Sequence, residues 1–392
     1  MLLRLALSGE NAELAPYHWN KKGGTHGRRI WKVKRMIFLL ALASVVFWLA
    51  GCEGRERAEE DADGQVPSDR VSEGIKLNQS VTELEDGLSA VRYEGEDGFE
   101  QFLKQGGADS DAKVLQYVAG LAGGSDKGLS MSGHPFGCST VSVKNPDGGY
   151  LFGRNFDWYR CEALVVEHHP ADGYASLSTV NLDFVTGGDR GKLPEKLLAL
   201  AALYAPLDGM NEKGLCVSVN MIQDEAVINQ DTGKPDITTT TAIRLLLNQA
   251  ADVPEALELL RSCDLHSSMG LMVHFAIADK DGNSVAAEYI GQELVVTQTP
   301  VLTNDYVAEG EKQGIGTEQS HTRSDRLKEA LEKHPVMDAG QVRDALENVS
   351  KHHFDDGETT EWSVVFDASR RCADYYHRED FEKAYTVQLP IE

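Results

Sequence analysis

Residues 137–158 read GCSTVSVKNPDGGYLFGRNFDW, and this stretch decides the fold. Its first part, 139–144, alternates along the chain and is rich in β-branched residues, and 150–156 has the same strand-like character. Between them, 145–149 reads NPDGG, a dense turn signal. The pattern predicts two adjacent antiparallel strands joined by a tight turn.

The register of this hairpin gives Cys138 its neighbours. Counting back from the turn places Cys138 opposite Phe156 on the partner strand. Arg154 and Asp157 then lie within roughly two residue spacings, about 7 Å, of the thiol. A thiol reacts as its thiolate, which nearby positive charge favours. The hairpin therefore predicts a thiol, a guanidinium and a carboxylate in one neighbourhood.

This neighbourhood suits a nucleophile that becomes a chain terminus. An α-amino group has a reference pKa near 8, so it can act as the general base for its own side chain. Gly137 lacks a side chain, which allows the close approach that attack on its carbonyl requires. We therefore expect cleavage of the Gly137–Cys138 bond to expose Cys138. Arg154 would hold the thiolate or orient the substrate amide, and Asp157 would place the freed amine.

Each of these residues has a plainer reading when it is taken alone. Cys138 fits a buried structural cysteine, and Arg154 with Asp157 fits an ordinary salt bridge. The joint pattern is what favours catalysis.

The motifs GCST at 137–140 and GRNFDW at 153–158 together resemble the cysteine N-terminal-nucleophile group of linear-amide hydrolases. This group includes choloylglycine (bile salt) hydrolases, penicillin V acylases, acid ceramidase relatives and isopenicillin N acyltransferases. In that group the cysteine begins the mature catalytic chain, and an arginine and an aspartate follow at the offsets of Arg154 and Asp157. The resemblance implies an α+β, four-layer αββα fold, a thioester acyl-enzyme and no cofactor.

The resemblance extends to three later segments. Asn220 ends a strand that matches the position whose backbone amide helps to form the oxyanion hole, and Asn304 resembles the asparagine that supplies a side chain to the same hole. Arg326 resembles the late active-site arginine, with Arg323 as a rival. On their own, the two asparagines would be turn residues and Arg326 a surface charge.

The chain before the catalytic region divides by composition. Basic residues precede a short apolar run that ends in Leu-Ala-Gly-Cys, the order of a secretory signal with a lipobox. This predicts a lipid on Cys52 and an exported protein held at the cell membrane. The expected boundaries are a doubtful upstream extension at 1–35, a signal peptide at 36–52, a disordered tether at 53–70, a helical pro-segment or small chain at 71–137 and a catalytic domain at 138–392.

Further elements follow from hydrophobic periodicity. Strands are expected at 163–167, 215–220, 274–278, 285–289, 294–297, 362–366, 375–377 and 384–389. Helices are expected at 240–250, 254–261, 322–333 and 338–349, with Thr240 or Thr241 capping the first and Asp338 the last.

Net charge and cysteine spacing argue against two classes of binding partner, nucleic acids and metal ions. The 392-residue chain has a formal charge of -24, although its first 51 residues hold eight Lys/Arg and only two Asp/Glu. So acidic a body disfavours binding to nucleic acid. The remaining cysteines show neither CxxC nor zinc spacing, so no metal is expected.

These observations predict an enzyme that hydrolyses the amide bond of a small N-acyl amide through Cys138. Two alternatives stay open: an acyltransferase that uses the same thioester, and a non-catalytic lipoprotein that binds a ligand. A papain-like protease is disfavoured because no histidine stands in a recognisable partner motif. The sequence leaves a homo-oligomer open and does not identify the substrate.

Overall fold

The computed structural model describes residues 72–74, 77, 79–188, 193–354 and 357–390. These residues lie in one compact unit, Pro67–Glu392. The expected upstream extension, signal peptide, lipobox Cys52 and the whole of the tether at 53–70 therefore lie outside the described residues. Over the described ranges, no helix is long and apolar enough to cross a membrane.

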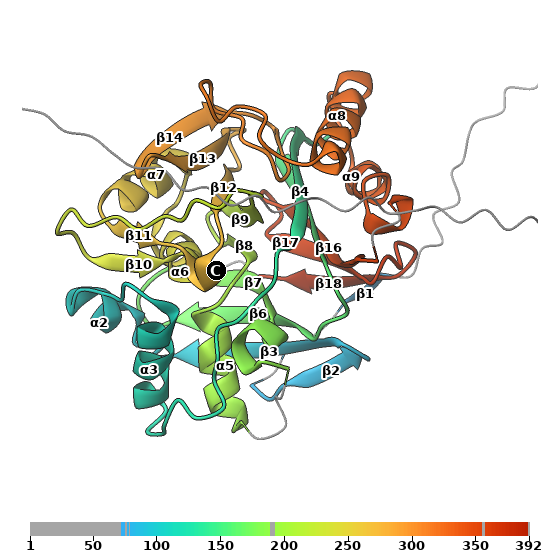
Figure 1. Ribbon diagram of the computed structural model, residues 1–392. Helices are drawn as coiled ribbons and strands as arrows, with labels where there is room; N and C mark the ends of the chain where they lie inside the picture. Colours follow the sequence, from blue (N-terminus) through green and yellow to red (C-terminus); the bar gives the residue numbers. More distant parts are fainter. Residues whose placement is uncertain (1–71, 75–76, 78, 189–192, 355–356, 391–392) are drawn as a thin grey trace, which may run out of the picture. The chain divides into compact units, whose positions relative to one another are not determined.

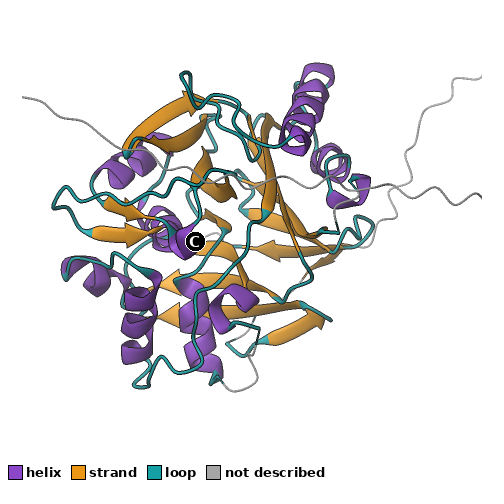
Figure 2. Ribbon diagram, viewed as in Figure 1, coloured by secondary structure: helices purple, strands orange, loops and turns teal. Residues whose placement is uncertain are grey.

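Two β-sheets form the centre of this unit, and helices cover their outer faces (Figures 1 and 2). The seven-stranded sheet has the order β1-β18-β17-β16-β5-β4-β15, and the nine-stranded sheet has the order β14-β13-β12-β9-β8-β7-β6-β3-β2. This is the expected α+β, four-layer αββα architecture.

The strand bounds of the seven-stranded sheet are β1 Ser72–Gly74, β18 Ala384–Gln388, β17 Cys372–His377, β16 Thr359–Asp367, β5 Tyr150–Trp158, β4 Gly137–Lys144 and β15 Val301–Leu302. Those of the nine-stranded sheet are β14 Glu293–Gln298, β13 Ser284–Ile290, β12 Val273–Ala278, β9 Cys216–Met221, β8 Asp208–Asn211, β7 Ser176–Asn181, β6 Ala163–Pro170, β3 Leu88–Gly95 and β2 Thr82–Glu85. A separate parallel pair is formed by β10 Asp236–Thr238 and β11 Asp264–His266.

Helices α8 (Glu318–Lys333) and α9 (Ala339–Glu347) pack on the seven-stranded sheet. Helices α5 (Glu195–Leu203), α6 (Thr239–Gln249) and α7 (Val253–Arg261) pack on the nine-stranded sheet, and α3 (Asp111–Leu121) lies against α5. The shorter helices are α2 Phe99–Lys104 and α4 Leu182–Thr186, with 3-10 turns at Ser268–Gly270 and Lys351–His353.

The hairpin that joins β4 to β5 has the predicted register. Lys144 pairs with Tyr150, and Cys138 pairs with Phe156. The turn closes through Asn145, whose backbone N–H donates to the Gly149 carbonyl at 2.8 Å and whose side-chain oxygen accepts from the Gly149 N–H at 2.8 Å. Because side chains alternate along a strand, this register fixes which face of the sheet each residue meets.

The two faces of the hairpin pack against different layers. Val141 and Leu151 belong to a cluster with Val342 of α9, on the helix side. Gly153 allows that contact, since a Cβ there would stand 2.7 Å from a Val342 methyl carbon. Cys138 and Phe156 belong instead to the core between the sheets. Alternation therefore directs the thiol into the space between the two sheets.

The other predicted elements are all present, with small shifts at their ends. Asp338 caps α9 as expected, accepting from the Gln341 N–H at 2.8 Å. Helix α6 differs by starting earlier, because Thr238 is its N-cap and forms a capping box with Thr241. The predicted caps Thr240 and Thr241 therefore lie inside the helix.

The segment 71–137 is more than the helical piece that was expected. It contains α2 and α3, but its strand β3 also lies within the nine-stranded sheet, parallel to β6. Leu88, Ala90 and Val91 are all buried there. The first four residues of β3 are all buried, so this half of the strand lacks the alternation of buried and exposed residues that reveals a strand in the sequence. The segment is thus built into the sheets of the catalytic domain.

Candidate active site

Cys138 lies at the start of β4 with its thiol fully buried between the two sheets. An Arg154 Nη2 donates to the sulfur at 3.4 Å, and the thiol lies 3.5 Å from the Val219 carbonyl. The backbone N–H of Met221 also lies beside the sulfur. Burial raises the pKa of the thiol to about 11, although Arg154 and this N–H oppose the shift. At neutral pH, Cys138 in this structure is therefore a neutral thiol.

Arg154 is held rigidly from the opposite sheet. Its Nη1 forms a fully buried ion pair with Asp208 of β8, and its Nε donates to Ser218 Oγ at 2.6 Å. Its guanidinium carbon lies 5.3 Å from the centroid of the Phe156 ring and 5.7 Å from that of Trp362. These contacts leave its Nη2 aimed at the thiol and at the Val219 carbonyl, which it meets at 3.1 Å.

A second chain of contacts reaches the backbone of Cys138 from the helix side of the sheet. Asp157 accepts from Arg323 of α8 at 2.5 Å and from Thr360 Oγ1 at 2.7 Å. Arg323 also donates to Asn304 Oδ1 at 2.6 Å. The same oxygen accepts the Cys138 backbone N–H at 2.9 Å. The nitrogen that cleavage would free is therefore already tied to Asn304, and through Arg323 to Asp157.

Gly137 is in close contact with Asp157, one member of this chain of contacts. A Cβ on Gly137 would stand 2.8 Å from Asp157 Oδ2 and 3.0 Å from its Cβ. Real Cβ atoms do not approach other atoms so closely, so any larger residue would displace the carboxylate. The expected need for glycine beside the cysteine thus has a specific cause, the proximity of Asp157.

The structure places Asn220 near the site, in a different role from the one expected. Ile222 N–H donates to the Met272 carbonyl at 2.8 Å, and hydrogen-bonded positions recur every second residue in an antiparallel ladder. The Asn220 N–H therefore faces β12, and the next amide, that of Met221, faces the thiol. The Asn220 side chain donates to the carbonyls of Leu302 and Thr303 at 3.1 and 3.2 Å. It holds the strand end that carries Asn304, and the Met221 N–H replaces the Asn220 N–H as the candidate oxyanion donor.

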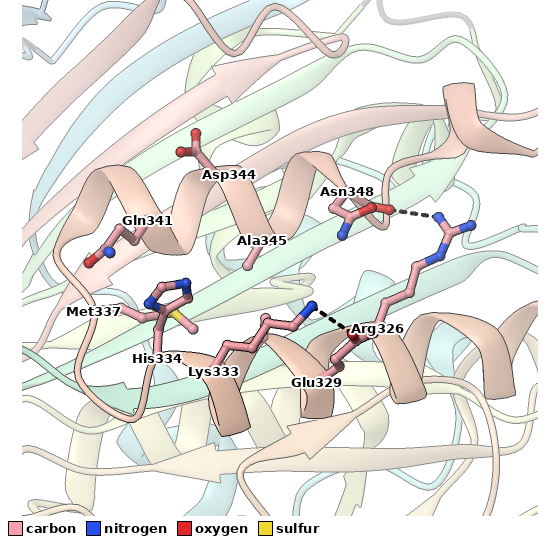
Figure 3. A pocket seen from close by; sticks show the side chains of 10 residues that line it. Arg326, Glu329, Lys333, His334, Met337, Gln341, Asp344, Ala345 and Asn348 are labelled. Carbon is pink, nitrogen blue, oxygen red and sulfur yellow. Dashed lines mark hydrogen bonds and ion pairs between the residues drawn. The ribbon is translucent and has the colours of Figure 1, made fainter. Parts of the chain in front are cut away.

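Arg326 lies outside this group of residues. Figure 3 shows its side chain in a pocket between α8 and α9, where it donates to the backbone carbonyl of Asn348 at 2.8 Å. Arg323 and Arg326 are three residues apart on α8, about 60° from each other around the helix, and their long side chains reach different partners. Arg323 is buried against Asp157 and Asn304, and it replaces Arg326 as the candidate late arginine.

The sequence reasoning missed Asp208, Ser218, Met221 and Trp362. Asp208 accepts from Arg154 and, at 2.9 Å, from Trp362 Nε1. These contacts cross between the sheets, and no sequence spacing encodes them. Of these four residues, only Met221 could have been found from the sequence, because it directly follows Asn220, the residue expected at the oxyanion hole. Within the described part of the chain, no group of three His, Cys, Asp or Glu side chains lies close enough to hold a metal ion.

Comparisons with known proteins give one family and several similar structures. A family model described as acyl-coenzyme A:6-aminopenicillanic acid acyl-transferase matches residues 200–380. No curated protein sequence matches the chain significantly. A variant of conjugated bile acid hydrolase from Clostridium perfringens is 18% identical, with a TM-score of 0.49 over 64% of this chain and 92% of its own. Penicillin V acylase from Agrobacterium tumefaciens is 17% identical, with a TM-score of 0.44 over 61% of this chain and 83% of its own.

The matched region and the hairpin supply complementary halves of one site. Residues 200–380 contain Asp208, Met221, Asn304 and Arg323, while the hairpin contributes Cys138, Arg154 and Asp157. Over residues 200–380, the chain is therefore similar to the acyl-coenzyme A:6-aminopenicillanic acid acyl-transferase family.

Proposed function

We propose that this protein hydrolyses linear N-acyl amides through the thiol of Cys138, after it has cleaved its own Gly137–Cys138 bond. The observation that carries the proposal is the surroundings of the sulfur. A guanidinium and a backbone N–H both point at it, and the preceding residue is a glycine in tight contact with Asp157.

Self-cleavage is an acyl transfer within the chain. The Cys138 sulfur attacks the Gly137 carbonyl carbon, and the thiol proton passes to the Cys138 nitrogen as the peptide C–N bond breaks. The product is a thioester between Gly137 and the sulfur, with a free amine on Cys138. Water then adds to the thioester, which releases the Gly137 carboxylate and regenerates the thiol. These reaction steps need no reactant other than water.

Turnover repeats these steps on an external amide. The freed amine, with a reference pKa near 8, takes the thiol proton and delivers it to the leaving amine. The Met221 N–H is the first donor for the oxyanion. Asn304 is the second candidate, because its Nδ2 lies beside that amide and donates to the Met221 carbonyl at 2.7 Å. Each such donor contributes on the order of 3 kcal/mol to transition-state stabilisation.

A mass measurement with matched variants tests the proposal. The purified wild-type chain is expected to show two fragments that join at 137/138, and it is expected to hydrolyse an N-acyl amide. Cys138→Ala should remain intact and inactive, whereas Cys216→Ala, another fully buried cysteine on β9, should be cleaved and active. An intact wild-type chain whose Cys138 no acyl probe labels would contradict the mechanism and favour a non-catalytic ligand-binding lipoprotein.

Acyl transfer is the second candidate function, and the description of the matching family favours it. The same thioester would be resolved by an amine instead of water. Adding a primary amine at rising concentration to the cleaved enzyme separates the two. A transferase will form mainly the new amide, whereas a hydrolase will continue to form mainly the free acid.

We also propose that the segment before Cys138 remains bound after cleavage and links the enzyme to the membrane. Strand β3 pairs along its whole length with β6, so cutting one peptide bond leaves that pairing in place. Size-exclusion chromatography of the cleaved protein should give one peak that contains both fragments.

The lipid anchor has its own test. Radiolabelled fatty acid should be incorporated into the wild-type chain and not into Cys52→Ser. Equal labelling of the two proteins would exclude this anchor.

A further inference from the structure

The side chain of Phe136, two residues before Cys138, fills a buried space that is lined by aromatic rings. Phe136 is buried, with its ring centroid 5.4 Å from that of Phe156 and 5.9 Å from that of Phe184. Its backbone N–H lies 3.4 Å from the sulfur of Met221. Trp158 extends the same wall, with its ring 4.8 Å from Phe184 in an edge-on contact. Phe136 thus sits among aromatic rings and a thioether.

The proposed self-cleavage reaction relates this pocket to substrate binding. In that reaction, the acyl group transferred to sulfur is the Phe136–Gly137 end of the segment. An external substrate must present its carbonyl to the same sulfur and the same Met221 N–H. Its acyl chain must therefore leave the carbonyl in the direction that the Phe136–Gly137 backbone now takes. We infer that the pocket filled by Phe136 is the acyl-group pocket of the mature enzyme, and that it selects acyl chains with an aromatic ring about six bonds from the carbonyl.

The spacing comes from covalent structure. From the Gly137 carbonyl carbon, the path runs through the Gly137 Cα and nitrogen, then through the Phe136 carbonyl carbon, Cα and Cβ to the ring, which makes about six bonds. A 6-phenylhexanoyl group has the same path length. A phenylacetyl group places its ring about two bonds from the carbonyl, which is too short to reach the same rings.

The segment can leave the pocket because it is held upstream of it. The backbone N–H groups of Ser130 and Ser132 donate to the carbonyls of Val185 and Phe184 at 2.9 and 3.0 Å. Cleavage would leave the five residues 133–137 as a free tail beyond these contacts. Five residues span at most about 18 Å, which is enough for the ring of Phe136 to withdraw.

Trp158 adds a polar feature to the pocket. Its indole N–H is buried and has no hydrogen-bond partner among the described residues. The same residue lines an adjoining cavity of about 300 Å³ with Ser132, His134 and Asp183. Buried donors are usually satisfied, so an unpaired one at a pocket wall is suited to an acceptor on a ligand. An ether or amide oxygen in the acyl chain would supply it.

The test is a series of p-nitroanilides that differ only in the acyl group, assayed with the cleaved wild-type enzyme. The series comprises acetyl, hexanoyl, phenylacetyl, 4-phenylbutanoyl and 6-phenylhexanoyl. We expect kcat/KM to be greatest for 6-phenylhexanoyl and about tenfold or more above that for hexanoyl. An optimum at phenylacetyl or acetyl, or equal values for hexanoyl and 6-phenylhexanoyl, would overturn the inference.

A pair of variants ties the preference to the pocket. Phe184→Leu should lower the 6-phenylhexanoyl to hexanoyl ratio of kcat/KM several-fold. Phe152→Leu is the matched control: Phe152 is equally buried on β5 but packs on Phe366 and pairs with Ser142, away from the thiol. It should leave the ratio unchanged. A ratio measured within one variant does not depend on the fraction that folds, so partial unfolding cannot imitate the result.

This inference rests on the proposed function, and the same assay separates their failures. An intact chain that hydrolyses none of the anilides refutes the proposed function and the pocket inference with it. A cleaved chain that hydrolyses anilides without the aromatic preference leaves the proposed function standing and refutes the pocket alone.

Discussion

At the scale of single residues, Gly137 shows how closely the proposed cleavage site is packed. Its missing side chain lets the Asp157 carboxylate approach the scissile bond, and Asp157 in turn holds Arg323 and through it Asn304. We predict that Gly137→Ala slows self-cleavage at least tenfold, because the new methyl group would displace the carboxylate. Intact mass over time after refolding measures the rate.

The control for this substitution is a glycine with open space around it. Gly120 lies on α3, and a Cβ there would meet nothing within 4 Å. Gly120→Ala should leave the cleavage rate unchanged and stabilise the helix by up to about 1 kcal/mol. Equal cleavage rates for wild type, Gly137→Ala and Gly120→Ala would show that the contact with Asp157 is irrelevant.

The pKa of Cys138 gives a second prediction at this scale. Burial raises the pKa of the thiol to about 11 in the uncleaved chain, so the thiolate fraction is small at neutral pH. Well below the pKa, that fraction grows about tenfold for each unit of pH. We expect the self-cleavage rate to rise with pH in the same proportion between pH 6 and 9. A rate independent of pH in this range would mean that thiolate formation does not limit cleavage.

At the scale of elements, the features that could be predicted are those set by residues close together in the sequence. Features set by contacts between distant segments could not be predicted. The β4–β5 hairpin was predictable because its own turn fixes the register. The candidate oxyanion amide moves from Asn220 to Met221, since the pairing of β9 with β12 decides which of the two N–H groups faces the thiol. Arg323 and Arg326 lie one helical turn apart, and only the packing of α8 on β4 separates them. Contacts between residues far apart in the sequence, such as that of Asp208 with Arg154, could not be predicted from sequence spacing.

The junction between α2 and the nine-stranded sheet contains a buried polar cluster that titrates. His168 of β6 lies 2.8 Å from Arg244 through Nδ1 and 3.1 Å from Asp97 through Nε2. Asp97 also accepts from the Phe99 N–H at the start of α2, at 2.8 Å. Burial lowers the pKa of His168 to about 4, and the Arg244 charge adds to the shift against the opposing effect of Asp97. Neutral His168 therefore joins the segment 71–137 to the sheet.

This cluster predicts loss of stability in mild acid. The unfolded chain, with a histidine pKa near 6.5, binds the proton more readily than the folded chain does. The contribution of His168 is thus complete above pH 6.5 and is lost as the pH falls toward 4, by about 3 kcal/mol in total. Denaturant titrations at several pH values measure it. His168→Gln should flatten this slope and the exposed His334→Gln should not; parallel slopes for all three proteins would refute the assignment.

At the scale of the whole catalytic unit, one ion pair joins the sheets at the active site. Arg154 comes from the seven-stranded sheet and Asp208 from the nine-stranded sheet, and both side chains are fully buried. Removing one partner of a buried pair leaves the other charge without compensation, at a cost of about 3–5 kcal/mol. The pair therefore positions the guanidinium beside the thiol and also makes the site depend on how the sheets are packed together.

The last prediction separates these two roles. Asp208→Asn should lower the free energy of unfolding by about 3–5 kcal/mol and slow self-cleavage, because Arg154 loses the contact that aims it at the sulfur. The exposed pair partner Glu329→Gln on α8 should change neither quantity measurably. The double variant Arg154→Met with Asp208→Leu removes both charges, so it should recover much of the stability while cleavage stays lost. Recovered cleavage in that double variant would show that the pair only supports the fold and that Cys138 needs no guanidinium.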